Sequence, residues 1–287
     1  MNYFIDEFKN YISVIKNYSQ NTVNSYLSDT ALFLDYIKTE NIPIENITEF
    51  NIMSYISFLG EKGKSSATRA RALASVKLYF HFLQKEGVVK ENPCEDIKPP
   101  HTEKKPPQIL SFDEVEKLLS APDISTKKGR RDKAMLELIY ATGMRAGEII
   151  LLKTDDINLD LNYCICSSAN GSRIIPFGKK AADALKNYIT DISENSTYIF
   201  GKTNGQPLSR QGFWKIIKEY AQKAGLNPSI NPSVLRSSFA AHMINNGADL
   251  ESVQELMGFN DINALNQYTK MNKKRIMDVY TSSHPRA

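Results

Sequence analysis

A proline-rich segment constrains the fold more than any other feature of the sequence. Residues 99–107 read PPHTEKKPP, with prolines at both ends and almost no residue suited to a core. Proline fixes its own φ angle and disfavours helix in the residue before it, so no helix continues through this segment. The 287 residues are enough for two separate cores. We therefore predict domains at residues 1–98 and 109–287, joined by a linker at residues 99–108.

The first domain carries apolar residues at helical spacing. One series runs from Val23 to Ile37, with Ser19 just ahead of it as an N-cap. Two further series follow at residues 52–59 and 73–83, and Gly87 then provides a stop signal. This half of the chain is predicted to be all helical.

The second domain mixes helical and strand signals. Ser111 is placed as the N-cap of one helix, and Gly143 ends another that covers residues 131–142. Residues 161–177 alternate in polarity and are rich in β-branched side chains, with Asn170–Gly171 as a hairpin turn. The whole chain is therefore expected to be mainly α with a small antiparallel sheet, an α+β fold.

Positive charge is concentrated on one segment. Between Lys62 and Lys85 there are six cations and no acid, although the chain as a whole carries a net charge of only +4. A cationic helix of this kind favours a partner rich in phosphate, such as nucleic acid.

Several other classes of protein are excluded by what the sequence lacks. It has no phosphate-binding glycine loop, no dinucleotide fingerprint, no HExxH motif and no carboxylate cluster typical of a metal-dependent nuclease. Its three cysteines do not suggest a disulfide framework or a metal site, and we expect Cys164 and Cys166 to be buried in a strand. No apolar run is long enough to span a membrane, and the beginning MNYFIDEFKN does not read as a signal peptide, so we expect a cytoplasmic protein.

A series of short motifs in a fixed order carries the functional signal. In chain order they are Asn21–Thr22 with Tyr26, the box ATGMRAGE at residues 141–148, Leu235–Arg236 before Phe239–Ala240, NGADL at residues 246–250, Tyr268–Thr269 and HPRA at residues 284–287. Taken together, the chain resembles the tyrosine recombinases, and more narrowly the Xer-type recombinases of bacteria. The resemblance covers nearly its whole length.

This resemblance implies a particular way of handling DNA. Members of the tyrosine recombinase family form a C-shaped clamp, with the two domains on opposite faces of a double-stranded DNA duplex. They bind partly palindromic sites in pairs, and two pairs make a tetramer. The last helix docks on a neighbouring subunit, so residues 272–287 would mediate self-association or association with a related recombinase.

The resemblance also implies the chemistry and its residues. A tyrosine attacks a DNA phosphate to form a 3′-phosphotyrosyl bond, with neither a metal ion nor a cofactor. Matched residue by residue, Tyr268 is the nucleophile, while Arg145 and Arg236 hold the non-bridging phosphate oxygens. Glu148 would orient the segment that carries the first arginine.

Three positions depart from the family pattern. Ser168 replaces a lysine on the hairpin, Ser233 replaces a histidine before the second arginine, and Phe259 replaces a histidine or tryptophan. Loss of one general acid or base typically slows a reaction by ~10²–10⁴-fold. We therefore expect recombination with reduced autonomous cleavage. The alternative is a DNA-binding architectural or regulatory member that does not cleave.

The DNA contacts are expected on three helices. By resemblance, the helix after Ser19, with Asn21 and Thr22, and the helix bearing Arg69 and Arg71 enter the major groove. Arg210, just before a helix in the second domain, is a further candidate contact with phosphate or base.

Overall fold

The structure is a computed structural model that describes residues 4–102, 106–168, 171–192, 196–202 and 205–269. The chain divides into two compact units, residues 1–105 and 106–287. Each unit has its own apolar core, as expected for a chain of this length.

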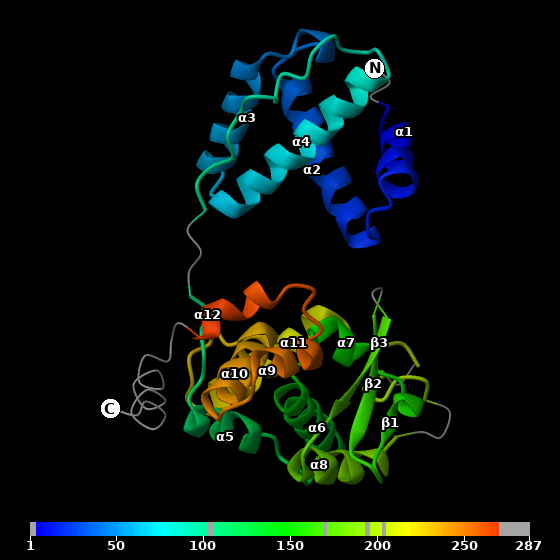
Figure 1. Ribbon diagram of the computed structural model, residues 1–287, viewed down its shortest axis with the longest axis vertical. Coiled ribbons are helices and arrows are strands. Elements are labelled where there is room, and N and C mark those ends of the chain that lie inside the picture. The colour runs from blue at the N-terminus through cyan, green and yellow to red at the C-terminus, as the bar shows by residue number, and fades with distance from the viewer. Residues whose placement is uncertain (1–3, 103–105, 169–170, 193–195, 203–204, 270–287) are drawn as a thin grey trace, which may run out of the picture. The chain divides into compact units, whose positions relative to one another are not determined.

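The first unit is a bundle of helices. Its elements are α1 (Ile5–Asn10), a π-helical turn η1 (Tyr11–Ile15), α2 (Gln20–Thr39), η2 (Ile44–Asn46), α3 (Glu49–Glu61) and α4 (Ser66–Lys85). α4 packs against both α2 and α3 (Figure 1). Aromatic side chains fill the core, with Phe33 in edge-to-face contact with Tyr55 and with Phe80.

Serine caps begin the two longest helices of this unit. The Ser19 hydroxyl accepts a hydrogen bond from the Thr22 amide, and Ser65 does the same for Thr68, each at 3.2 Å. Each serine thereby satisfies one amide that the helix itself leaves without a partner. The predicted helix start at Ser19 is confirmed.

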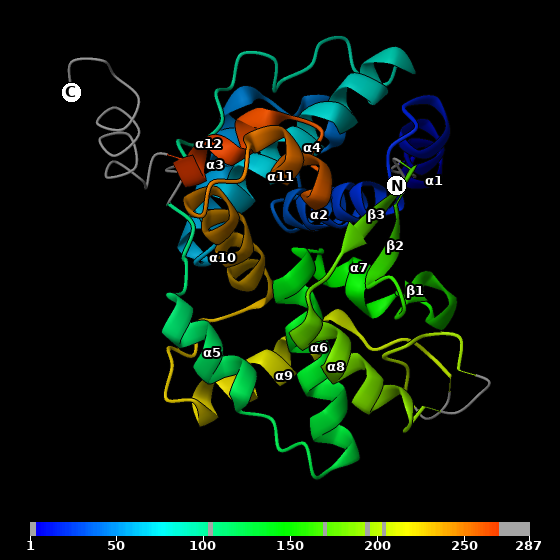
Figure 2. The ribbon, with the colours of Figure 1, turned by 60° about the horizontal axis from the view of Figure 1, so that its bottom comes forward.

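The second unit is built around one buried helix. Its elements are α5 (Phe112–Ser120), α6 (Lys127–Thr142), α7 (Ala146–Ile150), η3 (Thr154–Asp156), β1 (Ile157–Asn158), β2 (Tyr163–Ser168), β3 (Gly171–Pro176), α8 (Lys179–Ile189), α9 (Arg210–Lys223), α10 (Pro232–Asn245), α11 (Leu250–Met257), η4 (Ile262–Leu265) and α12 (Asn266–Thr269). α6 contacts α5, α7, α8 and α10, and the sheet and α10 lie on opposite sides of it (Figures 1 and 2).

The sheet is small and antiparallel, with strand order β1-β2-β3. Cys164 pairs with Ile175 and Cys166 with Arg173, so these four side chains share one face of the hairpin. The fold is mainly α with this one sheet, as the sequence predicted, and both cysteines are buried and free. The predicted turn at Asn170–Gly171 falls partly on residues 169–170, which lie outside the described residues.

None of the helices in the described ranges is both long and apolar enough to cross a bilayer.

Candidate functional site

A sharp turn after α6 positions Arg145. Gly143 ends the helix with a φ of +60°, and an added Cβ there would lie 2.3 Å from the Phe239 ring. Glycine is therefore required both by the backbone conformation and by the close packing. The chain turns at once into α7, and the Glu148 carboxylate accepts the Arg145 amide at 2.7 Å. The Arg145 side chain remains 47% exposed, so it is open to a ligand.

Arg236 reaches the same place from α10. Asn231 caps this helix, and Arg236 follows about one turn later. Its guanidinium donates to the Gly143 carbonyl and, at 2.7 Å, to the Met257 carbonyl. Burial and the nearby charge of Arg145 lower the pKa of Arg236 to about 10. The group is thus a cation held in a confined, positively charged environment.

The carboxyl end of α11 holds both arginines. Arg145 donates to the Gly258 carbonyl at 2.7 Å, next to the Met257 carbonyl that binds Arg236. Carbonyls at a helix carboxyl end lack partners within the helix and carry partial negative charge, so they attract cations. The Phe259 ring lies beneath both guanidiniums, with its centroid 5.9 Å from Arg145 and 4.8 Å from Arg236. Phe259 thus packs against both cations through its ring face.

Within the described residues, Glu148 is the carboxylate that contacts Arg145. It accepts the Arg145 side chain at 3.0 Å as well as the Arg145 amide. Burial would raise the pKa of Glu148, but hydrogen bonds from Arg173 and from Arg145 hold it at about 2. The carboxylate is therefore ionised throughout the physiological pH range.

Sequence reasoning missed Arg173, the second partner of Glu148. Its guanidinium makes a two-pronged contact with the Glu148 carboxylate, at 3.1 and 2.9 Å. A signal was present, because strand alternation puts Arg173 on the same face as the buried Ile175. An arginine on the buried face of a strand needs an anionic partner, and none is adjacent in the sequence.

Tyr268 lies in the small core formed by α10, α11 and α12. Its side chain is only 4% exposed, and its hydroxyl is 3.3 Å from the Ser237 hydroxyl. Ser237 directly follows Arg236 on α10 and is a second residue that sequence reasoning missed. The phenol lies close enough to Arg236 to influence the pKa of that guanidinium. The structure therefore brings Arg145, Arg236, Phe259 and Tyr268 to one region.

Ser233 and Ser168, which replace the histidine and the lysine of the family pattern, lie in different elements. Ser233 is exposed on the first turn of α10, and its amide donates to the Asn231 cap at 2.9 Å. Ser168 is the last residue of β2 and pairs with Gly171 across the hairpin, while its side chain lies outside the described part of the chain. Lys180 at the start of α8 is paired with Glu116 at 2.8 Å.

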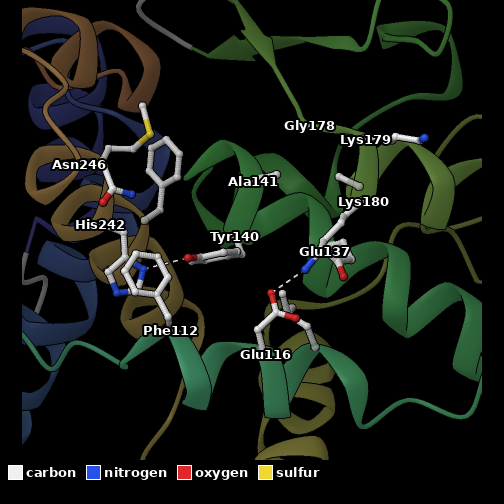
Figure 3. Close-up of a pocket in the computed structure, with 14 residues that line it drawn as sticks. Phe112, Glu116, Glu137, Tyr140, Ala141, Gly178, Lys179, Lys180, His242 and Asn246 are labelled. Carbon is white, nitrogen blue, oxygen red and sulfur yellow. Dashed lines mark hydrogen bonds and ion pairs between the residues drawn. The ribbon is translucent and has the colours of Figure 1, made fainter.

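His242 is engaged elsewhere and does not take the place of a missing histidine. It lines a cavity of about 410 Å³ between α5, α6 and α10. Its ring stacks on Phe112 at 4.0 Å, and the Tyr140 hydroxyl is 2.8 Å from its Nδ1, as Figure 3 shows. Burial lowers the pKa of His242, so the neutral ring prevails at physiological pH.

The residues of the first unit that are predicted to contact DNA differ in their exposure and in their hydrogen bonds. Asn21 is exposed on the first turn of α2, and Thr22 is hydrogen-bonded to the Ser19 cap at 2.9 Å. Arg69 on α4 is half-buried against Gly60 and donates to Ser66 at 3.3 Å.

Arg71 has a fixed partner that charge counting did not anticipate. It makes a two-pronged contact with the buried carboxylate of Asp29 on α2, at 2.9 and 2.8 Å. The absence of acids between Lys62 and Lys85 did not reveal this pairing, because Asp29 lies 42 residues away in the sequence. The side chain is still 51% exposed, so one face of the guanidinium is open.

Arg210 in the second unit is exposed at the start of α9 and lies against Gly147 of α7. An added Cβ on Gly147 would be 2.9 Å from its guanidinium. The predicted exchange segment at residues 272–287 lies outside the described residues.

Two family models match the chain, one for each unit. Residues 5–87 match the N-terminal SAM-like domain of phage integrases, and residues 108–275 match the phage integrase family. Tyrosine recombinase XerD of Listeria innocua is 39% identical over 297 residues, and XerD of Staphylococcus epidermidis is 38% identical over 295. In both comparisons 100% of each chain is covered.

Solved structures show the same fold. The XerA recombinase is 25% identical, with a TM-score of 0.56 over 100% of this chain and 99% of that one. XerH bound to a palindromic difH substrate after cleavage gives a TM-score of 0.77 at 21% identity, over 96% of this chain and 84% of that one. A lambda integrase dimer bound to a core site gives 0.72 at 19% identity, over 93% and 94%.

Proposed function

The chain belongs to the phage integrase family as an Xer-type tyrosine recombinase, and on that premise we propose that it exchanges strands between DNA duplexes at a partly palindromic site. The Tyr268 oxygen attacks a backbone phosphorus, forms a 3′-phosphotyrosyl bond and releases a 5′-hydroxyl. The 5′-hydroxyl of the partner duplex then attacks that bond and restores the tyrosine. Four copies act together in the cytoplasm, where the DNA is.

One observation carries this proposal. Arg145 at the N-cap of α7 and Arg236 on α10 bind neighbouring carbonyls, of Gly258 and Met257. Two planar guanidiniums fixed side by side match the non-bridging oxygens of one phosphate and stabilise the charge that develops on them. The half-exposed Arg145 is the point at which a phosphate first reaches the pair.

The nucleophile is close to this pair but covered. Because the Tyr268 side chain is only 4% exposed, the packing around its hydroxyl has to open before DNA can be attacked. We therefore propose that DNA binding moves α12 and breaks the 3.3 Å contact between Tyr268 and Ser237.

Cleavage by the isolated chain is expected to be slow. With Ser168 and Ser233 in place of the lysine and the histidine, water accepts the phenolic proton and protonates the leaving 5′-oxygen. Each positioned general acid or base typically contributes ~10²–10⁴-fold, so with both groups replaced the expected loss is at least of this size.

A nicked suicide duplex tests the proposal. A binding site is first selected from a random-sequence pool with the full-length protein and then built into a nicked duplex. Wild type is expected to form a covalent adduct that resists denaturant, and Tyr268→Phe to form none. Ser168→Lys with Ser233→His is expected to raise the adduct rate by roughly 10²-fold or more. If none of these proteins forms an adduct on a duplex that they bind, the assignment of these residues is wrong.

The second candidate is a DNA-binding regulatory member that does not cleave. The observation in its favour is Phe259, whose ring packs on both arginines but offers no hydrogen bond to a phosphate. It is supported if wild type binds the selected duplex without an adduct while the doubly substituted protein forms one.

A further inference from the structure

Arg173 is buried in the hairpin and directed at the site. It lies in the middle of β3, opposite the buried Cys166, and its side chain is 13% exposed. Burial opposes the charge on Arg173, yet its hydrogen bonds to Glu148 raise the pKa of the guanidinium. The cation is thus stably charged in a place that water barely reaches.

Three arginines bind three consecutive carbonyls at the end of α11. Arg173 donates to the Leu256 carbonyl at 2.9 Å, and the next two carbonyls bind Arg236 and Arg145, each at 2.7 Å. Such carbonyls have no partners further along the helix, so the three guanidiniums occupy acceptors that would otherwise require water. Arg173 therefore shares a fixed frame with both site arginines.

The same guanidinium also packs on the turn that follows α11. A Cβ added to Gly258 would lie 2.9 Å from one Arg173 nitrogen, and the backbone φ there is +61°. The turn thus accommodates Arg173 by having no side chain. A shift of Arg173 would move the Gly258 carbonyl, which is an acceptor for Arg145.

Glu148 provides a second connection between Arg173 and Arg145. One of its oxygens binds both Arg173 and Arg145 side chains, at 3.1 and 3.0 Å. The other groups facing Arg173 are the thiols of β2, and burial raises the pKa of Cys164 to about 12 and of Cys166 to about 11. These thiols stay neutral, so among the described groups Glu148 is the anion that balances Arg173.

We propose that Arg173 is a positioning residue for strand cleavage. It fixes Arg145 through the shared Glu148 carboxylate and fixes both site arginines through the end of α11. This inference rests on the proposed function. It also ties the hairpin that carries Ser168 to the groups that hold the phosphate.

The test compares Arg173→Lys and Arg173→Gln in single-turnover cleavage of the nicked suicide duplex at saturating protein. A misplacement of about 1 Å costs roughly 10²-fold in rate, so we expect a loss of this size for Gln and a smaller one for Lys, which keeps the charge but not the fork. The dissociation constant for the duplex should change by less than about threefold, because the buried group does not reach DNA. If the Arg173→Gln protein does not fold, the cleavage rate of Arg173→Lys tests the inference.

Arg130 is the matched control. It makes the same two-pronged contact with Asp191, at 2.6 and 2.9 Å, near the other end of α6. That end is roughly 20 Å from Gly143 at 1.5 Å per residue. Arg130→Gln should lower thermal stability but leave the cleavage rate within about twofold. Equal rate losses for Arg130→Gln and Arg173→Gln would mean a general effect on folding and would overturn the inference.

A second readout separates this inference from the proposed function. The Glu148 carboxyl is titrated by NMR, and its pKa should be higher in Arg173→Gln than in wild type because a main cause of its low value is gone. The acid limb of the cleavage profile should move to higher pH in parallel. An unchanged Glu148 pKa overturns the inference even if wild type cleaves. A raised pKa with no adduct from any variant supports the coupling and counts against the function.

Discussion

Two arginine forks, one chosen from each unit, differ in charge balance: Arg71 on Asp29 and Arg173 on Glu148. In the first unit Arg71 and Asp29 form a pair of one cation and one anion, with Ser75 as a further donor to the carboxylate. In the second unit Glu148 accepts hydrogen bonds from Arg145 and Arg173, and Arg236 joins these two arginines at the carboxyl end of α11. A balanced pair joins two helices, whereas three cations around one anion leave an excess of positive charge that attracts a phosphate.

Removing a cation from the unbalanced cluster should have the largest effect. Arg236→Ala is expected to lower the single-turnover cleavage rate by roughly 10³-fold or more, because a donor to the developing charge is lost. Its unfolding free energy should change by less than about 1 kcal/mol, since relief of a buried cation offsets the lost hydrogen bonds. Arg71→Ala is the comparison and should cleave within about twofold of wild type at saturating DNA. A similar rate loss in both variants would erase the distinction between the forks.

Removing the anion should make stability depend differently on pH. The pKa of Glu148 is about 2 in the folded chain, below its ordinary 4.5, so its contribution is present above pH 4.5 and is lost as the pH falls towards 2. This shift corresponds to about 3 kcal/mol of unfolding free energy. Between pH 7 and pH 3, urea denaturation should show a loss of about 2 kcal/mol of this for wild type, because the folded carboxylate is still ionised at pH 3, and a flatter profile for Glu148→Gln.

Glu219→Gln serves as the control for that titration. Glu219 is a more exposed carboxylate on α9, paired with Lys128 and Lys223. Its removal should change the profile by well under about 1 kcal/mol, as expected of a surface pair. A profile for Glu148→Gln as steep as that of wild type would contradict the role given to its arginine partners.

Substitution of Arg71, the cation of the balanced pair, should have the smallest effect, and it concerns the salt dependence of DNA binding. If the open face of Arg71 contacts a phosphate, Arg71→Ala lowers the slope of log K against log salt by about 0.9. Asp29→Asn is the matched variant, because it keeps the cation and removes only its partner. It should weaken the fold, as Arg71→Ala does, but keep the salt slope in a binding titration. An unchanged slope in Arg71→Ala, or equal changes in both, would assign Arg71 to structure alone.

Much of the fold could be predicted from the sequence because its signals are local. The caps at Ser19 and Ser111 and the stop at Gly143 depend on residues within one turn, and all three are confirmed. Helix α6 begins at Lys127, four residues before the predicted start, because Thr126 caps it in a polar stretch without apolar periodicity. Strand β1 was not predicted, since two residues, Ile157–Asn158, are too few to show an alternation.

The site was harder to predict because its partners are distant in the sequence. The pairing of Arg71 with Asp29 spans 42 residues, and the bond from Arg173 to the Leu256 carbonyl spans 83. No motif within one element contains both members of either contact. The site arginines also donate to backbone carbonyls. Every residue has such an acceptor, so the sequence does not indicate which ones are used.

The turn after α11 sets a limit on any attempt to redesign this protein. Libraries that vary the side chains around the proposed phosphate site would include Phe259. Its neighbour Gly258 should stay constant in such libraries, because a methyl group there would collide with the Arg173 guanidinium and strain the backbone. The freedom to vary Phe259 therefore depends on keeping the adjacent position without a side chain.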